Sequence, residues 1–157
     1  MSRNRILAVA GAAILLFVAG LSVYLIVRGR DTTQALTYDS LMSRLSTAGA
    51  TVTRGDPIEQ PFLSVPGRFL KVNGTDVQVF EYATTNAANG DASRVAPDGC
   101  AVGTTIHIGW IAAPHFFMQG RVIVIYVGID GEVLRLLALA LGPQFAGATD
   151  TRLPPCP

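Results

Sequence analysis

The feature that most constrains this chain is a run of 22 residues without a charged side chain, residues 6–27. As a helix that rises about 1.5 Å per residue, the run is about 33 Å long and matches the hydrocarbon core of a bilayer. We therefore predict a transmembrane helix. A cleaved signal peptide is the alternative, but its apolar region usually has about 7–15 residues and ends at a small-x-small site. Here the apolar run continues to Arg28, which favours an uncleaved signal anchor.

The charges on either side of this run set its expected orientation. Equal numbers of arginines flank it, so the positive-inside bias nearly cancels. These residues are Arg3, Arg5, Arg28 and Arg30. The free amino group adds to the N-terminal side, whereas Asp31 reduces the positive charge on the other side. We expect residues 1–5 to be a cytoplasmic tip of a single-pass protein of the cell membrane, and residues 28–36 to link the helix to an extracytoplasmic domain.

The remainder of the chain has the size of one domain. We assign residues 37–146 to this domain and residues 147–157 to a Pro-rich tail. From residue 36 onward there are eight basic and ten acidic residues, which give a formal net charge of −2. This balance gives no basic surface for nucleic acid. The expected partners are the membrane, through the apolar helix, and another envelope protein.

Cysteine usage adds one prediction. Cys100 and Cys156 are the two cysteines of the chain, and they lack the C-x-x-C spacing of many metal and redox sites. Outside the cytoplasm, two such residues most simply form a disulfide. We predict this bridge, which would fasten the tail to the domain.

Helical periodicity appears in three places. Thr37 and Asp130 each precede apolar residues at helical spacing, and Gly49 and Gly142 follow them as stop signals. A more polar pattern with the same period lies between these two. The predicted helices are residues 37–48, residues 84–95 and residues 131–141.

Alternating apolar and polar residues predict the strands. They are expected at residues 50–54, at an edge near residues 62–65, in a hairpin over residues 68–82, and at residues 104–111 and 121–128. In the hairpin, Asn73-Gly74 favours a type I′ turn, because both turn residues adopt positive φ. That turn places Lys71 opposite Asp76, as an ion pair across the strands.

This order of elements predicts an α+β fold. Behind the N-terminal transmembrane helix, we expect a two-layer domain. One layer is a mainly antiparallel sheet of about five strands, and the other is a set of helices packed on one face of that sheet.

Four stretches of the domain combine turns with apolar strands. They are QPFLSVPGRFLKVNGTDVQVFEY, GTTIHIGWIAAPHFF, GRVIVIYVG and LGPQFAG. Together they resemble a group of small bacterial exported or membrane-anchored α+β domains whose function is uncharacterised. The resemblance covers residues 60–147. It implies an extracytoplasmic domain, and it implies no activity, cofactor or site residue.

The sequence contains no local catalytic signature. A nucleophile with an adjacent base, a phosphate-binding glycine loop and an H-E-x-x-H zinc motif are all missing, and we expect no cofactor. His107 and His115, with Asp98 and Glu81 as companions, are the remaining candidates for a metal site, although their spacing is not that of a zinc site. The alternative is that His107 lies on the polar side of its strand and His115 fastens its loop through a ring hydrogen bond to the backbone.

Two apolar surfaces are candidate binding sites. The stretch around His115 is too apolar to stay in water, so most of it should fold under its loop, unless some side chains remain exposed as a contact patch. The residues of this possible interaction patch are Trp110, His115, Phe116, Phe117 and Met118. A second possible site is the sheet face of Phe69, Phe80 and Tyr82, unless residues 55–66 cover it.

These features leave three functions open. The sequence favours a membrane-anchored extracytoplasmic interaction or binding module without catalytic activity. The alternatives are a metal-assisted hydrolase that uses His107 and His115, and a domain that binds a small molecule or lipid on its open sheet face.

Overall fold

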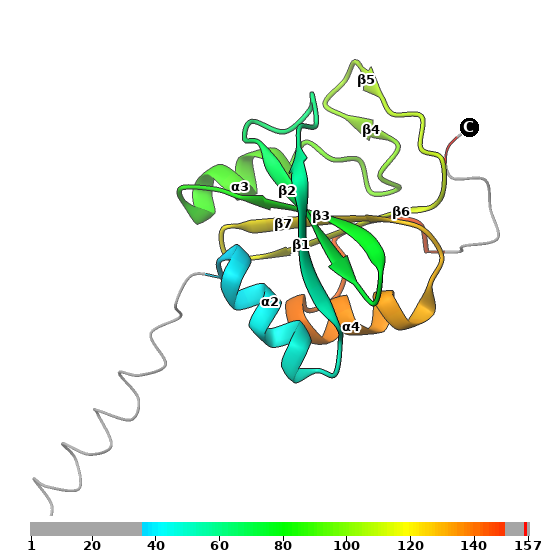
Figure 1. Ribbon diagram of the computed structural model, residues 1–157. Coiled ribbons are helices and arrows are strands. Elements are labelled where there is room, and N and C mark those ends of the chain that lie inside the picture. The colour runs from blue at the N-terminus through cyan, green and yellow to red at the C-terminus, as the bar shows by residue number, and fades with distance from the viewer. Residues whose placement is uncertain (1–35, 150–155, 157) are drawn as a thin grey trace, which may run out of the picture. The chain divides into compact units, whose positions relative to one another are not determined.

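The computed structural model of the chain describes residues 36–149 and residue 156 (Figure 1). The predicted cytoplasmic tip, transmembrane helix and most of the linker lie outside the described residues, as does most of the Pro-rich tail. The chain divides into two compact units, Met1–Gln34 and Ala35–Pro157, and the description below concerns the second. Among its described residues, no helix has the length and hydrophobicity that a membrane span requires.

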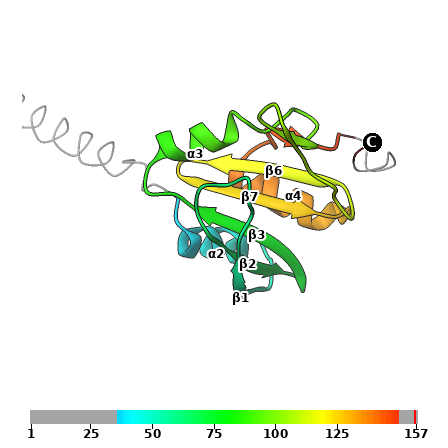
Figure 2. The same ribbon diagram turned by 90° about the horizontal axis from the view of Figure 1, so that it is seen from above.

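A six-stranded antiparallel sheet forms the centre of this unit, in the order β1-β2-β3-β7-β6-β8. Figure 2 looks onto the sheet and shows the strands following one another from β1 to β6. They are β1 (Val52–Ile58), β2 (Gly67–Val72), β3 (Thr75–Glu81), β6 (Pro114–Gln119), β7 (Val122–Val127) and β8 (Ala146–Gly147). A separate pair consists of β4 (Ala101–Val102) and β5 (Ile106–His107). The predicted α+β class is confirmed, with six strands in the main sheet.

The predicted hairpin is present, with the predicted register. Asn73 and Gly74 have φ values of 53° and 85°, as a type I′ turn requires. Lys71 is paired with Asp76 across β2 and β3, and their side chains form an ion pair of 2.7 Å. The turn also touches β1, because the Asn73 side-chain oxygen accepts a hydrogen bond from the Thr51 backbone at 2.9 Å. Local turn chemistry therefore sets the register of the first half of the sheet.

Three helices accompany the sheet: α2 (Tyr38–Thr47), α3 (Thr85–Ala92) and α4 (Gly131–Leu141). Thr37 caps α2 in a capping box with Ser40, and Asp130 accepts hydrogen bonds from the first turn of α4. Gly142, with a φ of 88°, follows the last turn of α4. All three helices occur where periodicity predicted them.

The helices cover both faces of the sheet, so the prediction that they lie on one face is wrong. In Figure 1, α2 and α4 lie below the sheet, and α3 lies above it. The reason is the composition of the central strands. In β3, Val77 and Val79 belong to the core beneath α2 and α4, whereas Phe80 belongs to the core on the α3 side. Because β7 is also apolar on both faces, each face requires a cover.

The second half of the sheet departs from the predicted strands. Only Ile106 and His107 of the predicted strand 104–111 are extended, and they form β5. The main-sheet strand β6 instead begins at Pro114, where a loop was expected. Proline is compatible with the first position of a strand. The residues that follow it point in turn into the two apolar cores on either side of the sheet, so no polar residues alternate with apolar ones. The search for alternating apolar and polar residues therefore selected residues 104–111 instead of β6.

The outer edge of the sheet at β1 is irregular. Its pairing with β2 shifts between Arg54 and Pro57, and β1 continues past the predicted end to Ile58. The predicted edge strand 62–65 forms turns instead, and it places Phe62 and Leu63 in the core on the α3 side.

Candidate binding groove

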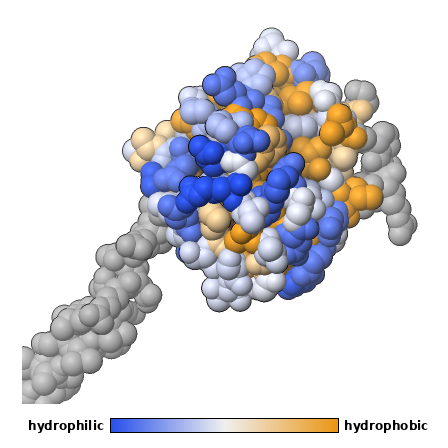
Figure 3. All heavy atoms as spheres, in the orientation of Figure 1, coloured by the Kyte–Doolittle hydropathy of each residue, from blue (hydrophilic) through white to orange (hydrophobic). Residues whose placement is uncertain are grey.

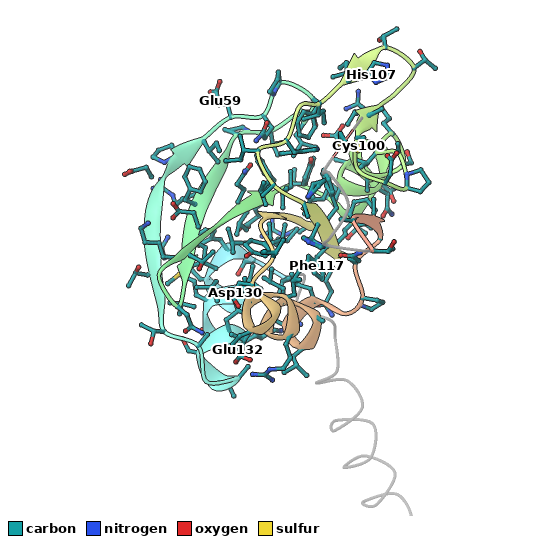
Figure 4. The ribbon with its side chains drawn as sticks, turned by 90° about the vertical axis from the view of Figure 1, so that its right-hand side faces the viewer. Glu59, Cys100, His107, Phe117, Asp130 and Glu132 are labelled. Atoms are coloured by element: carbon teal, nitrogen blue, oxygen red, sulfur yellow. A yellow bond between two sulfur atoms is a disulfide. The ribbon has the colours of Figure 1, made fainter. Side chains whose placement is uncertain are left out.

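Residues 96–111 form a small unit that stands above the main sheet. The two short strands β4 and β5 pair within it, and the Ile108 backbone donates a hydrogen bond to the Cys100 carbonyl at 2.9 Å. In Figure 1 this unit lies at the top of the domain and α2 lies at the bottom. Figure 4, seen from the side, likewise shows Cys100 and His107 at the upper end, with Asp130 and Glu132 at the lower end.

A disulfide connects this unit to the tail. Cys100 and Cys156 are bonded, with their Cα atoms 5.6 Å apart, which confirms the predicted pairing. Beside the bridge, the Asp98 carboxylate accepts a hydrogen bond from the Cys100 backbone at 2.9 Å and caps this turn. Cys156 thereby becomes part of the same surface as the β4–β5 unit.

Trp110 is the aromatic residue of this surface, and its orientation is fixed. Its indole N–H donates to the Gly99 carbonyl at 2.9 Å. Its ring makes edge contacts with Phe62 and Phe116, at centroid distances of 6.1 Å and 5.9 Å. The ring is half-buried, so one part is anchored in the core and the remainder borders the surface.

A groove of about 300 Å³ lies between these elements. The side chains that give it chemical character are Asp98, His107, Ile108, Trp110 and the Cys100–Cys156 disulfide. Two isoleucines of the same segment face solvent, since Ile106 is 39% exposed and Ile111 is 99% exposed. Hydrophobic residues are prominent on the upper right of the molecular surface in Figure 3. The groove thus combines one carboxylate, one imidazole and one indole within an apolar border.

The four candidate metal ligands do not gather at one point, although two of them, Asp98 and His107, line the same groove. His107 is exposed on β5, and Asp98 caps the turn at Cys100. Glu81, at the end of β3, forms a 2.5 Å ion pair with Arg121 and accepts a hydrogen bond from the Tyr38 backbone. Within the described residues, no three His, Cys, Asp or Glu side chains gather in a way that could hold a metal ion.

His115 lies in the interior of the sheet rather than in a loop. It is 2% exposed on β6 and stacks on Tyr126, with the ring centroids 5.9 Å apart. Its Nδ1 lies 2.8 Å from the Gln144 side-chain oxygen, and its Nε2 lies 3.1 Å from the Gly128 carbonyl. The expected bond to the backbone is therefore present, but it fastens a strand. Both ring nitrogens therefore face oxygen atoms of the same chain in the interior.

The proposed aromatic patch is not a surface. Phe116 and Phe117 are 0% and 2% exposed, and they belong to the cores on opposite sides of the sheet. Phe117 accordingly lies in the interior in Figure 4. Because His115 is also buried and Met118 is half-buried, Trp110 is the member of that set that borders the groove. The other side chains are buried because β6 lies between the two cores of the domain.

The proposed site on the sheet face is covered. Phe80 and Tyr82 are 0% and 1% exposed, beneath the segment that contains Phe62 and Leu63. Phe69 is half-buried toward the β1 edge of the sheet. The anticipated cover by residues 55–66 therefore closes this face to a ligand.

Sequence reasoning did not identify the buried carboxylate Asp91 of α3. Its Oδ2 accepts hydrogen bonds from the Ser64 backbone (2.7 Å), the Ser64 hydroxyl (2.8 Å) and Tyr82 (2.8 Å), while Arg94 donates to Oδ1 at 2.5 Å. Burial opposes ionisation, but these hydrogen bonds outweigh it and hold the pKa of Asp91 below its ordinary value. Burial and the bond to Asp91 raise the pKa of Tyr82. The available signal was an aspartate beside Ala88 and Ala92 on the inward face of α3.

This cluster supports the groove from below. Arg94 also donates to the Phe62 carbonyl at 3.1 Å, and Phe62 in turn contacts the Trp110 ring. Asp91 and Arg94 therefore hold α3 against the segment on which the tryptophan rests.

Comparisons with protein-family models, with curated protein sequences and with solved structures found no match to this chain.

Proposed function

We propose that this chain is a membrane-anchored extracytoplasmic binding module without catalytic activity, whose contact surface is the groove beside Trp110. The observation that carries the proposal is the 99% exposure of Ile111 directly after a tryptophan whose ring is fixed by a hydrogen bond and two aromatic contacts. Aromatic residues are enriched in protein interfaces, and exposed apolar side chains beside them add surface that a partner can bury.

The arrangement of the domain suits a tethered module. Leu36, at the start of the described chain, is 2% exposed and packs in the core with α2. The β4–β5 unit lies at the other end of the domain from α2 (Figure 1). A tether attached at Leu36 would join the domain at its α2 end, whereas the groove belongs to the β4–β5 unit. Support for the anchor itself comes from the length of that segment in the sequence.

Site-specific crosslinking in intact cells tests the proposed surface. The photoreactive residue p-benzoylphenylalanine replaces Ile111 in one variant and Ile129 in a matched control. Ile129 is 65% exposed and does not line the groove. We expect a discrete covalent adduct from position 111 and none from position 129. Equal crosslinking at both positions, or none at either, would contradict the groove as the contact surface.

Membrane fractionation of the same cells tests the anchor. We expect the full-length chain to remain in the membrane pellet after carbonate extraction, because an apolar run of about 20 residues is long enough to span the bilayer. A soluble fragment that begins near Leu36 would show instead that the N-terminal segment is cleaved.

A further inference from the structure

We propose that the groove beside Trp110 receives a lysine or arginine side chain from a polypeptide partner. This inference rests on the proposed function and specifies the chemistry of the partner. The argument combines the charge of the groove, its aromatic wall and its apolar border.

The described residues of the groove carry an unbalanced charge. Asp98 contributes a carboxylate, of which one oxygen accepts a hydrogen bond from the Cys100 backbone. The described part of the chain gives this carboxylate no ion pair, whereas five other acidic residues each pair with a lysine or arginine. In addition, residues 96–120 contain neither lysine nor arginine. A positively charged group from outside the chain would therefore complement the groove.

The aromatic wall favours the same charge. The face of an indole attracts ammonium and guanidinium groups through the ring quadrupole. Trp110 lines the groove, and the bond from its N–H to Gly99 together with its two aromatic contacts holds the ring in this position. A long basic side chain suits this geometry, because its alkyl part packs on Ile108 while its charge reaches Asp98.

The apolar border indicates that the cation belongs to a polypeptide. The groove, at about 300 Å³, is at the lower end of the size range of ligand sites, roughly 300–1,000 Å³, and suits one side chain. Ile106 and Ile111 lie outside it and remain exposed. A free amine would leave both isoleucines in water, whereas the residues that flank a lysine in a peptide would cover them.

The test uses the full-length protein in detergent micelles and the fluorescence of Trp110, which is the one tryptophan of the chain, so the emission reports on the surroundings of this ring. The probes are three peptides of sequence acetyl-Gly-Val-X-Val-Gly-amide, in which X is lysine, norleucine or glutamate. Norleucine keeps the four-carbon chain of lysine and lacks the ammonium group.

We expect the lysine peptide to bind about fivefold more tightly than the norleucine peptide, from one exposed ion pair and one cation–π contact, and the glutamate peptide to bind most weakly. Asp98→Asn should reduce the preference for lysine to the part that Trp110 contributes, because the amide oxygen can still accept the bond from Cys100 while the charge is lost. Asp98→Glu, which retains the charge, should restore the preference. Asp56→Asn is the matched control, since Asp56 is exposed on β1 and does not line the groove.

Three results would overturn the inference. The first is equal binding of the lysine and norleucine peptides, and the second is an unchanged lysine preference in Asp98→Asn. The third is equally tight binding of N-acetyl-lysine amide, which would identify a small cation as the ligand. None of these depends on crosslinking at position 111. If position 111 forms adducts but the peptides show no lysine selectivity, the groove stays the proposed contact surface and only the basic partner is rejected.

Discussion

Removal of the Asp91 carboxylate should destabilise the domain more than any change to its exposed charges. The side chain of Asp91 is 8% exposed and accepts bonds from Ser64, Tyr82 and Arg94. Asp91→Ala leaves the buried Tyr82 hydroxyl and the Ser64 N–H without their acceptor. Asp91→Asn keeps the shape but removes the charge and presents an amide N–H₂ to groups that donate.

The expected magnitude follows from the kind of bonds that are lost. Hydrogen bonds to a charged group contribute about 1.5–3 kcal/mol each and are not additive within one network, whereas loss of one member of a buried charge network costs about 3–5 kcal/mol. We expect Asp91→Ala to lower the free energy of unfolding by about 3–4 kcal/mol and Asp91→Asn by about 2 kcal/mol. For a domain of this size, 3 kcal/mol corresponds to roughly 12 °C in Tm.

The same residue should make stability depend on pH. Because the folded state lowers the pKa of Asp91, it favours the ionised form. This contribution is fully present above the unfolded pKa, about 3.9, and is lost as the pH falls through the lower folded value. The wild-type protein should therefore lose stability below about pH 4 partly through Asp91, and Asp91→Asn should lose less over that interval.

Urea unfolding of the full-length protein in a mild detergent, followed by Trp110 fluorescence, measures both effects. The ring contacts Phe62, so its emission reports the segment that Asp91 holds. The control is Asp76→Asn, because the Lys71–Asp76 pair is about half-exposed and should contribute less than about 1 kcal/mol. Equal losses in Asp91→Asn and Asp76→Asn, or an unchanged acid dependence in Asp91→Asn, would refute the reasoning.

Three further outcomes are expected in the same unfolding assay. Cys156→Ser removes a bridge between residues 56 positions apart and should lower stability by about 4 kcal/mol in the chain-entropy model, whereas an unchanged midpoint under reducing conditions would contradict this. Leu41→Ala, at a 0% exposed position, should lose about 2–5 kcal/mol. Leu139→Ala, at a 64% exposed position, should change stability by less than about 0.5 kcal/mol, and similar losses in the two leucine variants would argue against the assigned core. Gly147→Ala should lose at least about 3 kcal/mol, because its φ is 114° and a Cβ would collide with a carbonyl oxygen of β6. Gly90→Ala, in open space on α3, should be neutral or stabilising.

Those parts of the fold that depend on neighbouring residues could be predicted from the sequence. The Asn73-Gly74 turn sets the pairing of β2 with β3, and the caps Thr37 and Asp130 locate two helices, because each signal acts within a few residues. Strand β6 could not be found in this way. Its residues alternate between two apolar cores, and this pattern appears only once α3 and α4 occupy opposite faces.

The candidate site was predicted only as separate residues. Asp98 and His107 were considered as metal ligands, Trp110 as part of an aromatic patch, and Cys156 as half of a disulfide. The fold of the β4–β5 unit brings them to one groove, and no local pattern encodes that proximity. The Asp91 cluster also could not be predicted from a local pattern. Ser64 lies 27 positions from Asp91 in the chain, and the bond between them depends on the tertiary fold.

The irregular β1 edge affects how copies of this domain behave at high local concentration. An open strand edge can recruit the same edge of a neighbouring copy and begin aggregation. Here the shift in pairing at Arg54–Pro57, the missing N–H of Pro57 and the adjacent charge of Asp56 interrupt the row of donors and acceptors that such growth requires. At the opposite edge, β8 has only two residues, and the Gly147 N–H already bonds to Pro97. Both edges therefore disfavour extension of the sheet into a second molecule, and copies at high local concentration should remain dispersed.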